Sequence, residues 1–571
     1  MCVVNWSDRM GVWEKYDLRA LLLGMALSVL VTLYSAYAGL KIGGVYWPIL
    51  TTTLAAMAVL KFLGKTDRSE INIAQTAGSA GGLLAAGVIF TIPAFYMLGV
   101  PVGLLDIFLV SLSGGLLGIL FSYPLRHEMI DKDKLPYADG TAAASMIESG
   151  DGKGGKIRLM AGGFGLGALV ALGRDFFGAI PGAINLETMK SDAAKIFSFG
   201  TIVSLIPLAG GYLIGFAFTA AWFSGAVITY FVIAPNAVLS HLAPDKYAIV
   251  IGMAKPLGIG IVIGSALAYF AFIGVPRLNA VIGEMMRKGA AKKPKTPFQK
   301  KFAGALFVIA ALLAVALNLD VGIAVVALVG AFAMAYIGAR VTGEMNVDPM
   351  EIFAIIVLIA AKILFGASAG PLVLLAAVVC ISAGVAGDMM QDLKTGRILG
   401  TDPNRQLIAQ VAGVFVASIV IGILIMAIGA RYQFGGLDFP APQASAIKEV
   451  VSSQGAGAPV CLKGVYSEEI APIFAFFRIG DCLGAGVMLG VLMTIASQFI
   501  GSGAIPIAFG IGMYVPIELS LPLFIGGIIR YVVDMRGKTE TFRVLAAGAI
   551  AGEGLVGAII AIVGAAMLLL R

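Results

Sequence analysis

Apolar runs that are long enough to cross a bilayer recur along almost the whole of this 571-residue chain. A bilayer core requires about 20 predominantly apolar residues in a helix. Hydrophobic residues make up 59% of the chain and charged residues only 13%, whereas a soluble protein carries roughly 25% charged residues. So few charges cannot cover a water-facing surface of this length. The sequence therefore predicts an all-α polytopic membrane protein.

The apolar runs predict roughly 16 transmembrane helices. The run 197–234 is too long for one crossing and is expected to break near Gly210–Gly215, and the run 505–533 contains three prolines. Both are predicted to fold as two short, broken or re-entrant pieces. The expected spans are 20–40, 44–62, 72–98, 101–122, 157–180, 197–234, 248–275, 302–318, 320–339, 350–367, 370–392, 406–429, 482–500, 505–533 and 544–570.

Lys and Arg gather in three loops, 61–70, 123–158 and 276–301. Such loops stay on the cytoplasmic side, and an even number of crossings separates them, so one topology places all three inside, together with an N-terminal segment 1–19. The net charge of +7 is thus explained by membrane orientation, and a nucleic-acid partner is not expected. We expect a multi-pass protein of the cell (inner or plasma) membrane, with the lipid bilayer as its partner and a homodimer left open.

Two pairs of segments recur at nearly the same spacing. Residues 36–44 read AYAGLKIGG and residues 335–343 read AYIGARVTG, at an offset of 299. Residues 223–232 read FSGAVITYFV and residues 524–533 read FIGGIIRYVV, at an offset of 301. Two matches at one spacing indicate an internal duplication.

The duplication divides the chain into a first membrane repeat at 20–300, a linker helix at 302–318 and a second membrane repeat at 320–571. Basic loops of one half coincide with weakly charged or mixed loops of the other, which favours inverted repeats. Inverted repeats are a common device of transporters, which bind substrate where the halves meet.

The densest cluster of polar residues inside a predicted span is INIAQTAGSAGG, at 71–82. Asn72, Gln75, Thr76 and Ser79 are three or four residues apart and share one face of a helix. Polar groups at membrane depth are costly and usually functional, so we interpret this face as lining a substrate path. For the glycines, a close helix–helix contact is the alternative interpretation.

A second polar cluster, GDMMQDLKTG at 387–396, ends another span. Asp388, Gln391 and Asp392 share a face and are candidate substrate-binding residues. Asp388 lies deeper in the span and is also a candidate for proton coupling.

Two glutamates near the end of the chain are further candidates. Glu518 lies between prolines in the broken segment 505–533, where freed backbone groups can face a cavity, and is a candidate substrate-binding residue. Glu553 lies inside the last span with no cation within four residues. We therefore expect a lone carboxylate that takes part in proton coupling; a protonated Glu that is hydrogen-bonded to a neighbouring helix is the alternative.

Four cysteines and two histidines are too few for a disulfide scaffold or for metal ligation, so no metal site and no cofactor are expected. Cys461 and Cys482 could pair if both face an oxidising side. GASAG at 366–370 matches the G-x-S-x-G pattern of serine hydrolases, but such a pattern arises easily by chance in a glycine-rich chain. An enzyme is therefore not expected, and a lone buried carboxylate with duplicated halves suits alternating access better than a passive channel.

The polar motifs resemble those of a known family. NIAQTAGSAGGLLAAGVIFTIP at 72–93 looks like the signature of the oligopeptide transporter (OPT) family, and DMMQDLKTG at 388–396 is similar to its second recurring motif. The regions 505–530 and 551–554 resemble its prokaryotic branch. The resemblance implies secondary active uptake, usually coupled to protons, with the two polar motifs lining the pathway.

The resemblance leaves two substrate classes open. Eukaryotic members divide into importers of small peptides and Yellow Stripe-like importers of metal chelates. We expect proton-coupled uptake of small oligopeptides, because a peptide zwitterion needs an acid for its ammonium group and donors for its carboxylate. The alternative is proton-coupled import of siderophore- or nicotianamine-like metal complexes, whose chelator already satisfies the metal.

Overall fold

The computed structural model describes residues 15–64, 66–150, 155–185, 197–239, 249–269, 271–272, 304–305, 308–309, 321–346, 348–452, 482–498, 505–537 and 539–569. This part of the chain is almost wholly helical, as predicted, and ten of its helices are long and apolar enough to cross a membrane. The basic loop 276–301 and nearly all of the expected linker helix 302–318 lie outside the described residues.

The helices of the first half, with one pair of strands, are α2 (Lys15–Ile42), α3 (Ile49–Phe62), α4 (Arg68–Ile89), α5 (Pro93–Leu98), α6 (Leu104–Ser122), α7 (Ala138–Ser149), α8 (Gly155–Ala171), β1 (Ala183–Asn185), β2 (Gly200–Ile202), α9 (Leu205–Ile214), α10 (Phe216–Val227), α11 (Ala234–Leu239) and α13 (Lys255–Tyr269). The helices of the second half are α16 (Val321–Met345), α17 (Met350–Phe365), α18 (Ala369–Leu399), α19 (Pro403–Arg431), α20 (Pro442–Ser452), α22 (Cys482–Gln498), α23 (Ile505–Tyr514), α24 (Ile517–Met535) and α25 (Thr539–Leu569).

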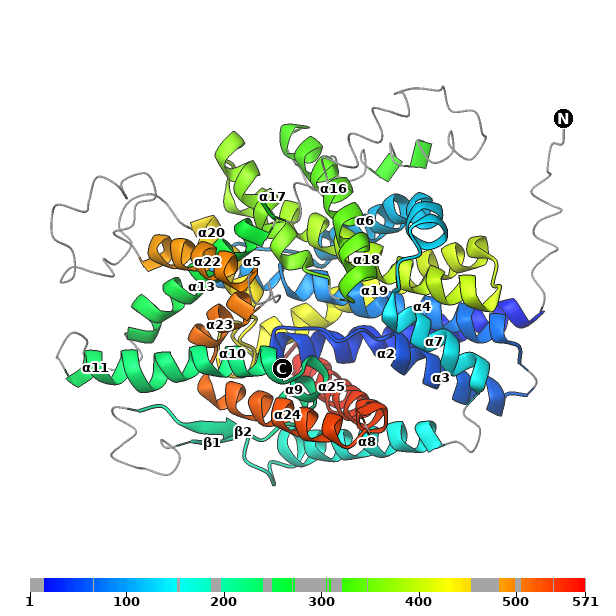
Figure 1. Ribbon diagram of the computed structural model, residues 1–571, viewed down its shortest axis with the longest axis horizontal. Helices are drawn as coiled ribbons and strands as arrows, with labels where there is room; N and C mark the ends of the chain where they lie inside the picture. The colour runs from blue at the N-terminus through cyan, green and yellow to red at the C-terminus, as the bar shows by residue number, and fades with distance from the viewer. Residues whose placement is uncertain are drawn as a thin grey trace.

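The helices pack in two groups, and each group contains helices from both halves of the chain (Figure 1). In the first bundle α4 and α18 lie at the centre, surrounded by α2, α6, α16 and α19, with α3, α7, α17 and α20 around them. In the second bundle α8 packs on α25, α13 on α22, α9 on α24 and α10 on α23. The two bundles meet where α25 crosses α2 and α19.

Both predicted breaks in long apolar runs are confirmed. α9 ends at Ile214 and α10 begins at Phe216, and Gly215 between them has a φ of 104°, which favours glycine. α23 ends at Tyr514, and α24 begins after Pro516. A helix does not continue through Pro516, because proline lacks an N–H group and disfavours helical geometry in the preceding residue.

Two short helices lie in segments that the sequence predicts to be loops. α7 lies within the predicted loop 123–158, and α20 follows α19. Each begins after a non-glycine residue with positive φ, Tyr137 at 43° and Ala441 at 40°. The amide of Tyr137 donates to the carbonyl of Gly343, and that of Ala441 donates to the carbonyl of Leu40, both at 3.1 Å. The C-terminal end of a membrane helix therefore holds the start of each short helix.

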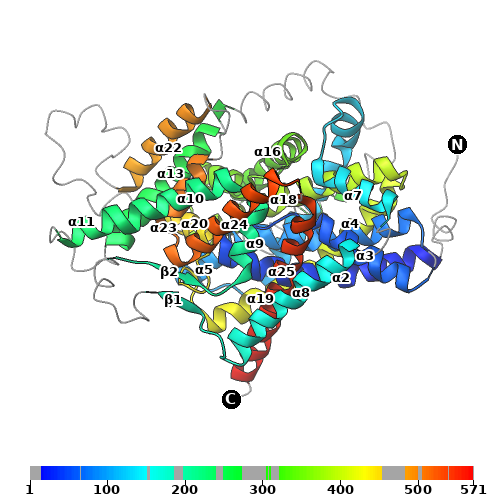
Figure 2. The ribbon, with the colours of Figure 1, turned by 60° about the horizontal axis from the view of Figure 1, so that its bottom comes forward.

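A small antiparallel hairpin departs from the all-α expectation. β1 pairs with β2, with Ile184 opposite Thr201. Figure 2 shows the hairpin at the edge of the molecule, and β2 packs against α24 of the second bundle. Because each strand has three residues, the hairpin is a local addition to a helical fold.

Glycines allow the paired helices of the second bundle to touch through their backbones. A Cβ atom on Gly163 or Gly167 of α8 would overlap carbonyl oxygens of α25, and one on Gly548 or Gly552 of α25 would overlap carbonyl oxygens of α8. Glycines at i and i+4 on both α13 and α22 make the same kind of contact: Gly260, Gly264, Gly486 and Gly490. Because lipid tails are as apolar as the helix surfaces, the hydrophobic effect does not drive these helices together. Close van der Waals packing at small residues stabilises their association instead.

This packing predicts opposite effects for two neighbouring substitutions on α8. Gly167→Ala should destabilise the protein by about 1–3 kcal/mol, because the added methyl group overpacks the contact with Ala549. Gly165→Ala should leave stability unchanged or raise it by up to about 1 kcal/mol, because a Cβ there meets no atom within 4 Å and alanine favours the helix. Thermal unfolding of the detergent-purified variants measures both; equal melting temperatures would contradict the contact.

Candidate functional site

α4 carries the first predicted polar cluster, and its sequence determines where the helix begins. Asp67 is the N-cap, and its side chain accepts a hydrogen bond from the amide of Glu70 at 2.7 Å. Arg19 of α2 donates to both carboxylate oxygens of Glu70, at 2.6 and 2.8 Å. Every residue of α4 from Glu70 to Ile89 is buried. Its polar side chains therefore face other helices and not lipid.

Asp388 and Asp392 lie one turn apart on α18 and face α4. The hydroxyl of Ser79 lies 2.9 Å from Oδ2 of Asp392 and 3.2 Å from Oδ2 of Asp388. Nε2 of Gln75 donates to Oδ1 of Asp392 at 2.5 Å. All four side chains are 0% exposed. The fold thus brings the two polar motifs together across 309 to 317 residues of sequence.

α19 supplies two further amides that the sequence analysis missed. Nε2 of Gln410 donates to Oδ2 of Asp388 at 2.9 Å. Nε2 of Gln406 donates to the backbone carbonyl of Asp392 at 2.6 Å and lies 3.3 Å from Oγ1 of Thr76. The signal was present in the sequence, because two glutamines four residues apart in an apolar span are costly unless other helices satisfy them.

Several acceptor oxygens in this polar cluster have no hydrogen-bond partner among the described residues. They are Oδ1 of Asp388, Oε1 of Gln75 and Oε1 of Gln410, and Asn72 on α4 has neither its oxygen nor its nitrogen satisfied. A buried polar atom without a partner usually costs about 1–3 kcal/mol. Unmet acceptors around a carboxyl pair are suited to receive a proton or a cationic group of a ligand.

Gln391 lies apart from the two carboxylates and binds α7. Its Oε1 accepts from the amide of Gly140 at 2.8 Å, and its Nε2 donates to Oδ1 of Asn346 at 2.6 Å. The hydroxyl of Thr395 donates to the carbonyl of Gly140 at 2.8 Å. Gln391 and Thr395 therefore hold α7 against α18, next to the carboxyl pair.

Asp348, another residue that the sequence analysis did not single out, precedes α17 and lies against Gly387 of α18. Neither of its carboxylate oxygens has a hydrogen-bond partner among the described residues. Burial, with a smaller contribution from nearby Glu351, raises the pKa of Asp348 to about 8. A further buried carboxyl group therefore lies beside Gly387, the residue that precedes Asp388.

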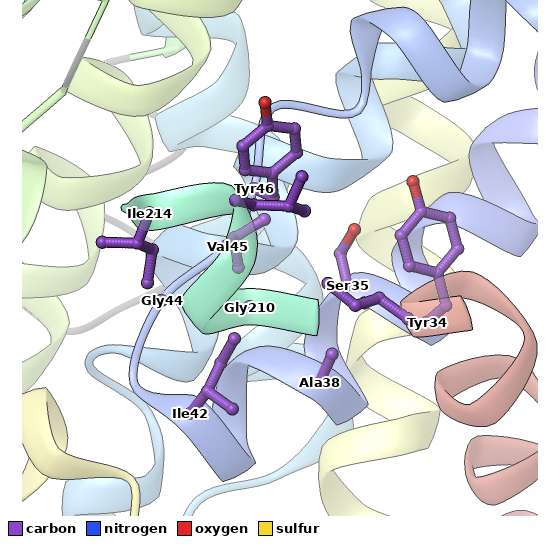
Figure 3. A pocket seen from close by; sticks show the side chains of 11 residues that line it. Tyr34, Ser35, Ala38, Ile42, Gly44, Val45, Tyr46, Gly210 and Ile214 are labelled. Atoms are coloured by element: carbon purple, nitrogen blue, oxygen red, sulfur yellow. The ribbon is translucent and has the colours of Figure 1, made fainter. Parts of the chain in front are cut away.

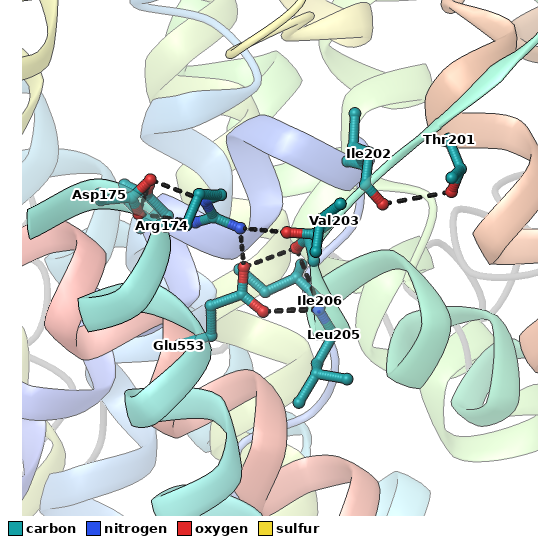
Figure 4. A network of polar contacts seen from close by, with 10 residues as sticks. Arg174, Asp175, Thr201, Ile202, Val203, Leu205, Ile206 and Glu553 are labelled. Carbon is teal, nitrogen blue, oxygen red and sulfur yellow. Dashed lines mark hydrogen bonds and ion pairs between the residues drawn. The ribbon is translucent and has the colours of Figure 1, made fainter. Parts of the chain in front are cut away.

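Glu553 is surrounded by donors from two other elements (Figure 4). Its Oε1 accepts from Nη1 of Arg174 and from the hydroxyl of Ser204, both at 2.6 Å. Its Oε2 accepts from the amides of Leu205 at 2.6 Å and Ile206 at 3.2 Å. Because Ser204 is the N-cap of α9, the carboxylate also lies at the positive end of that helix.

The expectation of a lone carboxylate at Glu553 is therefore wrong. Arg174, which follows α8, supplies the missing cation, and it also donates to both oxygens of Asp175 at 2.6 Å. Arg174 is 379 residues away in sequence, so the absence of a cation within four residues of Glu553 gives no information about it. In this conformation Glu553 joins α8, α9 and α25.

Glu518 lies elsewhere, in the first turn of α24 in the second bundle, and is half-buried. Within the described residues, no group of three or more His, Cys, Asp or Glu side chains is placed to hold a metal ion. Cys482 is disulfide-bonded, and Cys461 lies outside the described residues, so their pairing stays a prediction.

The contacts around Glu553 predict a large loss of stability when Arg174 is replaced by a neutral residue. Arg174→Gln should destabilise the protein by about 3–5 kcal/mol, because it leaves a buried carboxylate without its charge partner. The double variant Arg174→Gln/Glu553→Gln should recover part of that loss, since the unpaired charge is gone. Arg397→Gln, which removes an exposed ion pair with Asp131, should cost about 1 kcal/mol or less. Melting temperatures that fall equally for Arg174→Gln and Arg397→Gln would contradict the network.

Comparison with known proteins finds relatives that are named as transporters. A protein of Haemophilus influenzae, named as a candidate oligopeptide transporter, is 26% identical over 93% of this chain and 92% of its own length. A protein of Oryza sativa subsp. japonica, named as a candidate metal–nicotianamine transporter, is 27% identical over 30% of this chain and 23% of its own length. A candidate oligopeptide transporter of Saccharomyces cerevisiae is 27% identical over 40% of this chain and 32% of its own length.

The family described as OPT oligopeptide transporter protein matches residues 16–563, which is nearly the whole chain. The match covers both bundles and both polar motifs that meet at Ser79, Asp388 and Asp392. The described residues include ten helices suited to cross a membrane. The chain is therefore a multi-pass membrane protein, and it belongs to the OPT family of transporters.

Proposed function

We propose that this transporter imports small oligopeptides together with protons, and that Asp388 and Asp392 hold the coupled proton. The observation that carries the proposal is the carboxyl pair itself, buried where α4, α18 and α19 meet and contacted by Ser79, Gln75 and Gln410. Membership of the OPT family supports transport. The site adds a place for the proton and for one end of the substrate.

The geometry of Ser79 supports a shared proton. Its hydroxyl group has one hydrogen but lies within hydrogen-bonding distance of an oxygen from each carboxyl group. It donates to only one of these oxygens at a time, so the other contact is favourable when that carboxyl group holds a proton and donates to Ser79. None of the ion pairs among the described residues includes Asp388 or Asp392. Two buried carboxyl groups this close, without a cation, are stable when one of them holds a proton.

The unmet oxygens around the pair favour a substrate with an ammonium group. Oδ1 of Asp388, Oε1 of Gln75 and Oε1 of Gln410 are all acceptors and all lack partners among the described residues. A peptide N-terminus brings three N–H donors and a positive charge, which the ionised carboxyl group of the pair would balance while the other carboxyl group keeps its proton. Proton and ammonium group are then bound side by side, as cotransport requires.

Reciprocal contacts support the proposal that the two halves are repeats, here related by a two-fold axis. A Cβ on Gly211 would overlap the carbonyl of Leu523, and a Cβ on Gly512 would overlap the carbonyl of Trp222. Gly211 and Gly512 are 301 residues apart, as are Trp222 and Leu523. Gly225 against Phe509 and Gly526 against Leu208 repeat the relation at the same offset.

This pattern, in which residue i contacts j while the equivalent of i contacts the equivalent of j, is what a pseudo-two-fold axis produces. It also has the offset of the second repeat found in the sequence. We propose that the two bundles, each built from both halves, reorient against each other during transport.

A second candidate substrate is a metal chelate, which the match to the rice protein named for metal–nicotianamine favours. Competition with peptide uptake separates the two. Inhibition by metal-loaded but not by metal-free nicotianamine would identify the chelate as the substrate. Inhibition by unlabelled peptides alone supports the peptide.

Asp388→Asn is the sharpest test of the proton site. In proteoliposomes with an acidic exterior, the wild type should accumulate labelled tri- or tetrapeptides, and the variant should lose about 90% or more of this gradient-driven uptake because it cannot exchange a proton. Exchange of internal for external peptide without a pH gradient should persist, since the amide resembles the protonated carboxyl group.

The matched control is Asp402→Asn, which changes the exposed N-cap of α19 and should keep gradient-driven uptake. Wild-type uptake that ignores the pH gradient would overturn proton coupling. Uptake of no peptide across the panel would overturn the peptide as substrate. Full gradient dependence in Asp388→Asn would remove the proton from this pair.

A further inference from the structure

A cavity of about 90 Å³ lies between the two bundles (Figure 3), and neither Asp388 nor Asp392 lines it. The C-terminal half of α2 and the loop Gly44–Tyr46 form its wall in the first bundle. The segment Gly210–Ile214 of α9 and Ile550 of α25 form its wall in the second. A group bound here would contact both bodies that have to move relative to each other during transport.

The lining of the cavity is apolar apart from three hydroxyl groups. No charged side chain lines it. The hydroxyl of Tyr34 bonds to that of Thr51 at 3.0 Å, whereas the hydroxyl of Ser35 is shielded from solvent and has no partner among the described residues. Ser35 is 3% exposed, so this group is a fixed, unmet hydrogen-bonding site in an otherwise apolar wall.

An ion pair between the bundles lies next to Tyr46, one of the residues that line the cavity. Nε of Arg543 on α25 donates to the hydroxyl of Tyr46 at 2.5 Å, and Nη2 donates to Oδ1 of Asp139 on α7 at 3.0 Å. The guanidinium group also lies 5.5 Å from the centre of the Tyr46 ring. A smaller cavity, lined by Tyr46 and Arg543, lies on the far side. Tyr46 therefore separates two spaces, and the Arg543–Asp139 pair holds it there.

We propose that this cavity is a subsite for a small aliphatic side chain of the transported peptide, and that Tyr46, Arg543 and Asp139 form its gate. The proposal rests on the proposed peptide function and adds the substrate class to it. An uncharged wall favours an aliphatic group over a charged one, and the hydroxyl of Ser35 bonds to the adjoining peptide group. The volume equals that of about three water molecules, which fits a side chain of valine or leucine size.

Thiol labelling tests the subsite without transport. Ser35→Cys should react with N-ethylmaleimide, and neutral N-acetyl-leucinamide should slow the reaction whereas N-acetylglycinamide should not. Arg543→Gln added to Ser35→Cys should speed the reaction several-fold, because the gate is open. Ser28→Cys is the matched control: Ser28 lies on α2, is 0% exposed and donates to the carbonyl of Gly413, so it should label slowly in all conditions.

Filling the cavity tests its role in selection. A Cβ on Gly44 meets no atom within 4 Å, so Gly44→Ala adds a methyl group without a clash, and Gly44→Val and Gly44→Leu extend the series in size. The ratio of trileucine to triglycine uptake should fall stepwise along the series, by about tenfold or more for the last. Gly165→Leu, at a position on α8 where a Cβ also meets no atom within 4 Å, should leave the ratio unchanged.

The outcomes separate this proposal from the proposed function. Wild-type uptake of both peptides, with an unchanged ratio in Gly44→Leu, would overturn the subsite and leave peptide transport standing. Protection by both amides alike, or by neither, would also overturn it. If the wild type transports no peptide, the proposed function fails, while protection of Ser35→Cys by N-acetyl-leucinamide still decides whether the cavity takes an aliphatic group.

Discussion

Lipid offers no hydrogen bonds, so each polar side chain that a helix carries into the bilayer must find its partner inside the protein. Ser79 is short, and it reaches two carboxyl groups because α4 and α18 touch closely. A Cβ on Gly87 of α4 would overlap the side chain and backbone of Ile381 on α18, and one on Gly413 of α19 would overlap the carbonyl of Ala77 on α4. Glycine contacts thus set the helix spacing, and the spacing sets the geometry of the site.

The two buried carboxyl sites solve this constraint in opposite ways. Glu553 receives a hydroxyl, two backbone amides and a guanidinium group that it shares with Asp175, so both of its oxygens have donors. Asp388 and Asp392 receive only amide and hydroxyl donors in the described structure. The first arrangement stabilises a fixed charge and joins helices. The second is balanced only when a proton or a cation is present, which is why we place the coupled proton on this pair.

Sequence patterns were sufficient where the decisive contact is local. Gly215 and Pro516 break the chain through their own backbone geometry, so both breaks could be predicted. The polar faces of α4 and α18 were visible from their spacing, although their meeting through Ser79 was not. α7 and α20 were missed because the residues that start them, Tyr137 and Ala441, are held by helices far away in sequence. The partner of Glu553 was missed for the same reason.

α7 and α20 differ in how they contact the second bundle. Asp139 is the second residue of α7 and Gln443 is the second residue of α20, and both helices begin after a residue with positive φ. Gln443 donates to the carbonyl of Gly43, a contact within the first bundle. Asp139 instead pairs with Arg543 of the second bundle.

The second residue of the short helix therefore makes a contact within one bundle in α20 and a charged contact between the two bundles in α7. A transporter must break such a contact in every cycle. Asp139 is 2% exposed and Arg543 20%, so parting this pair is costly unless each charge gains water or a new partner. Arg543 and Asp139, which hold Tyr46 over the cavity, thus connect movement of the second bundle to α7. Gln391 in turn fixes α7 to α18, next to the proton-binding pair.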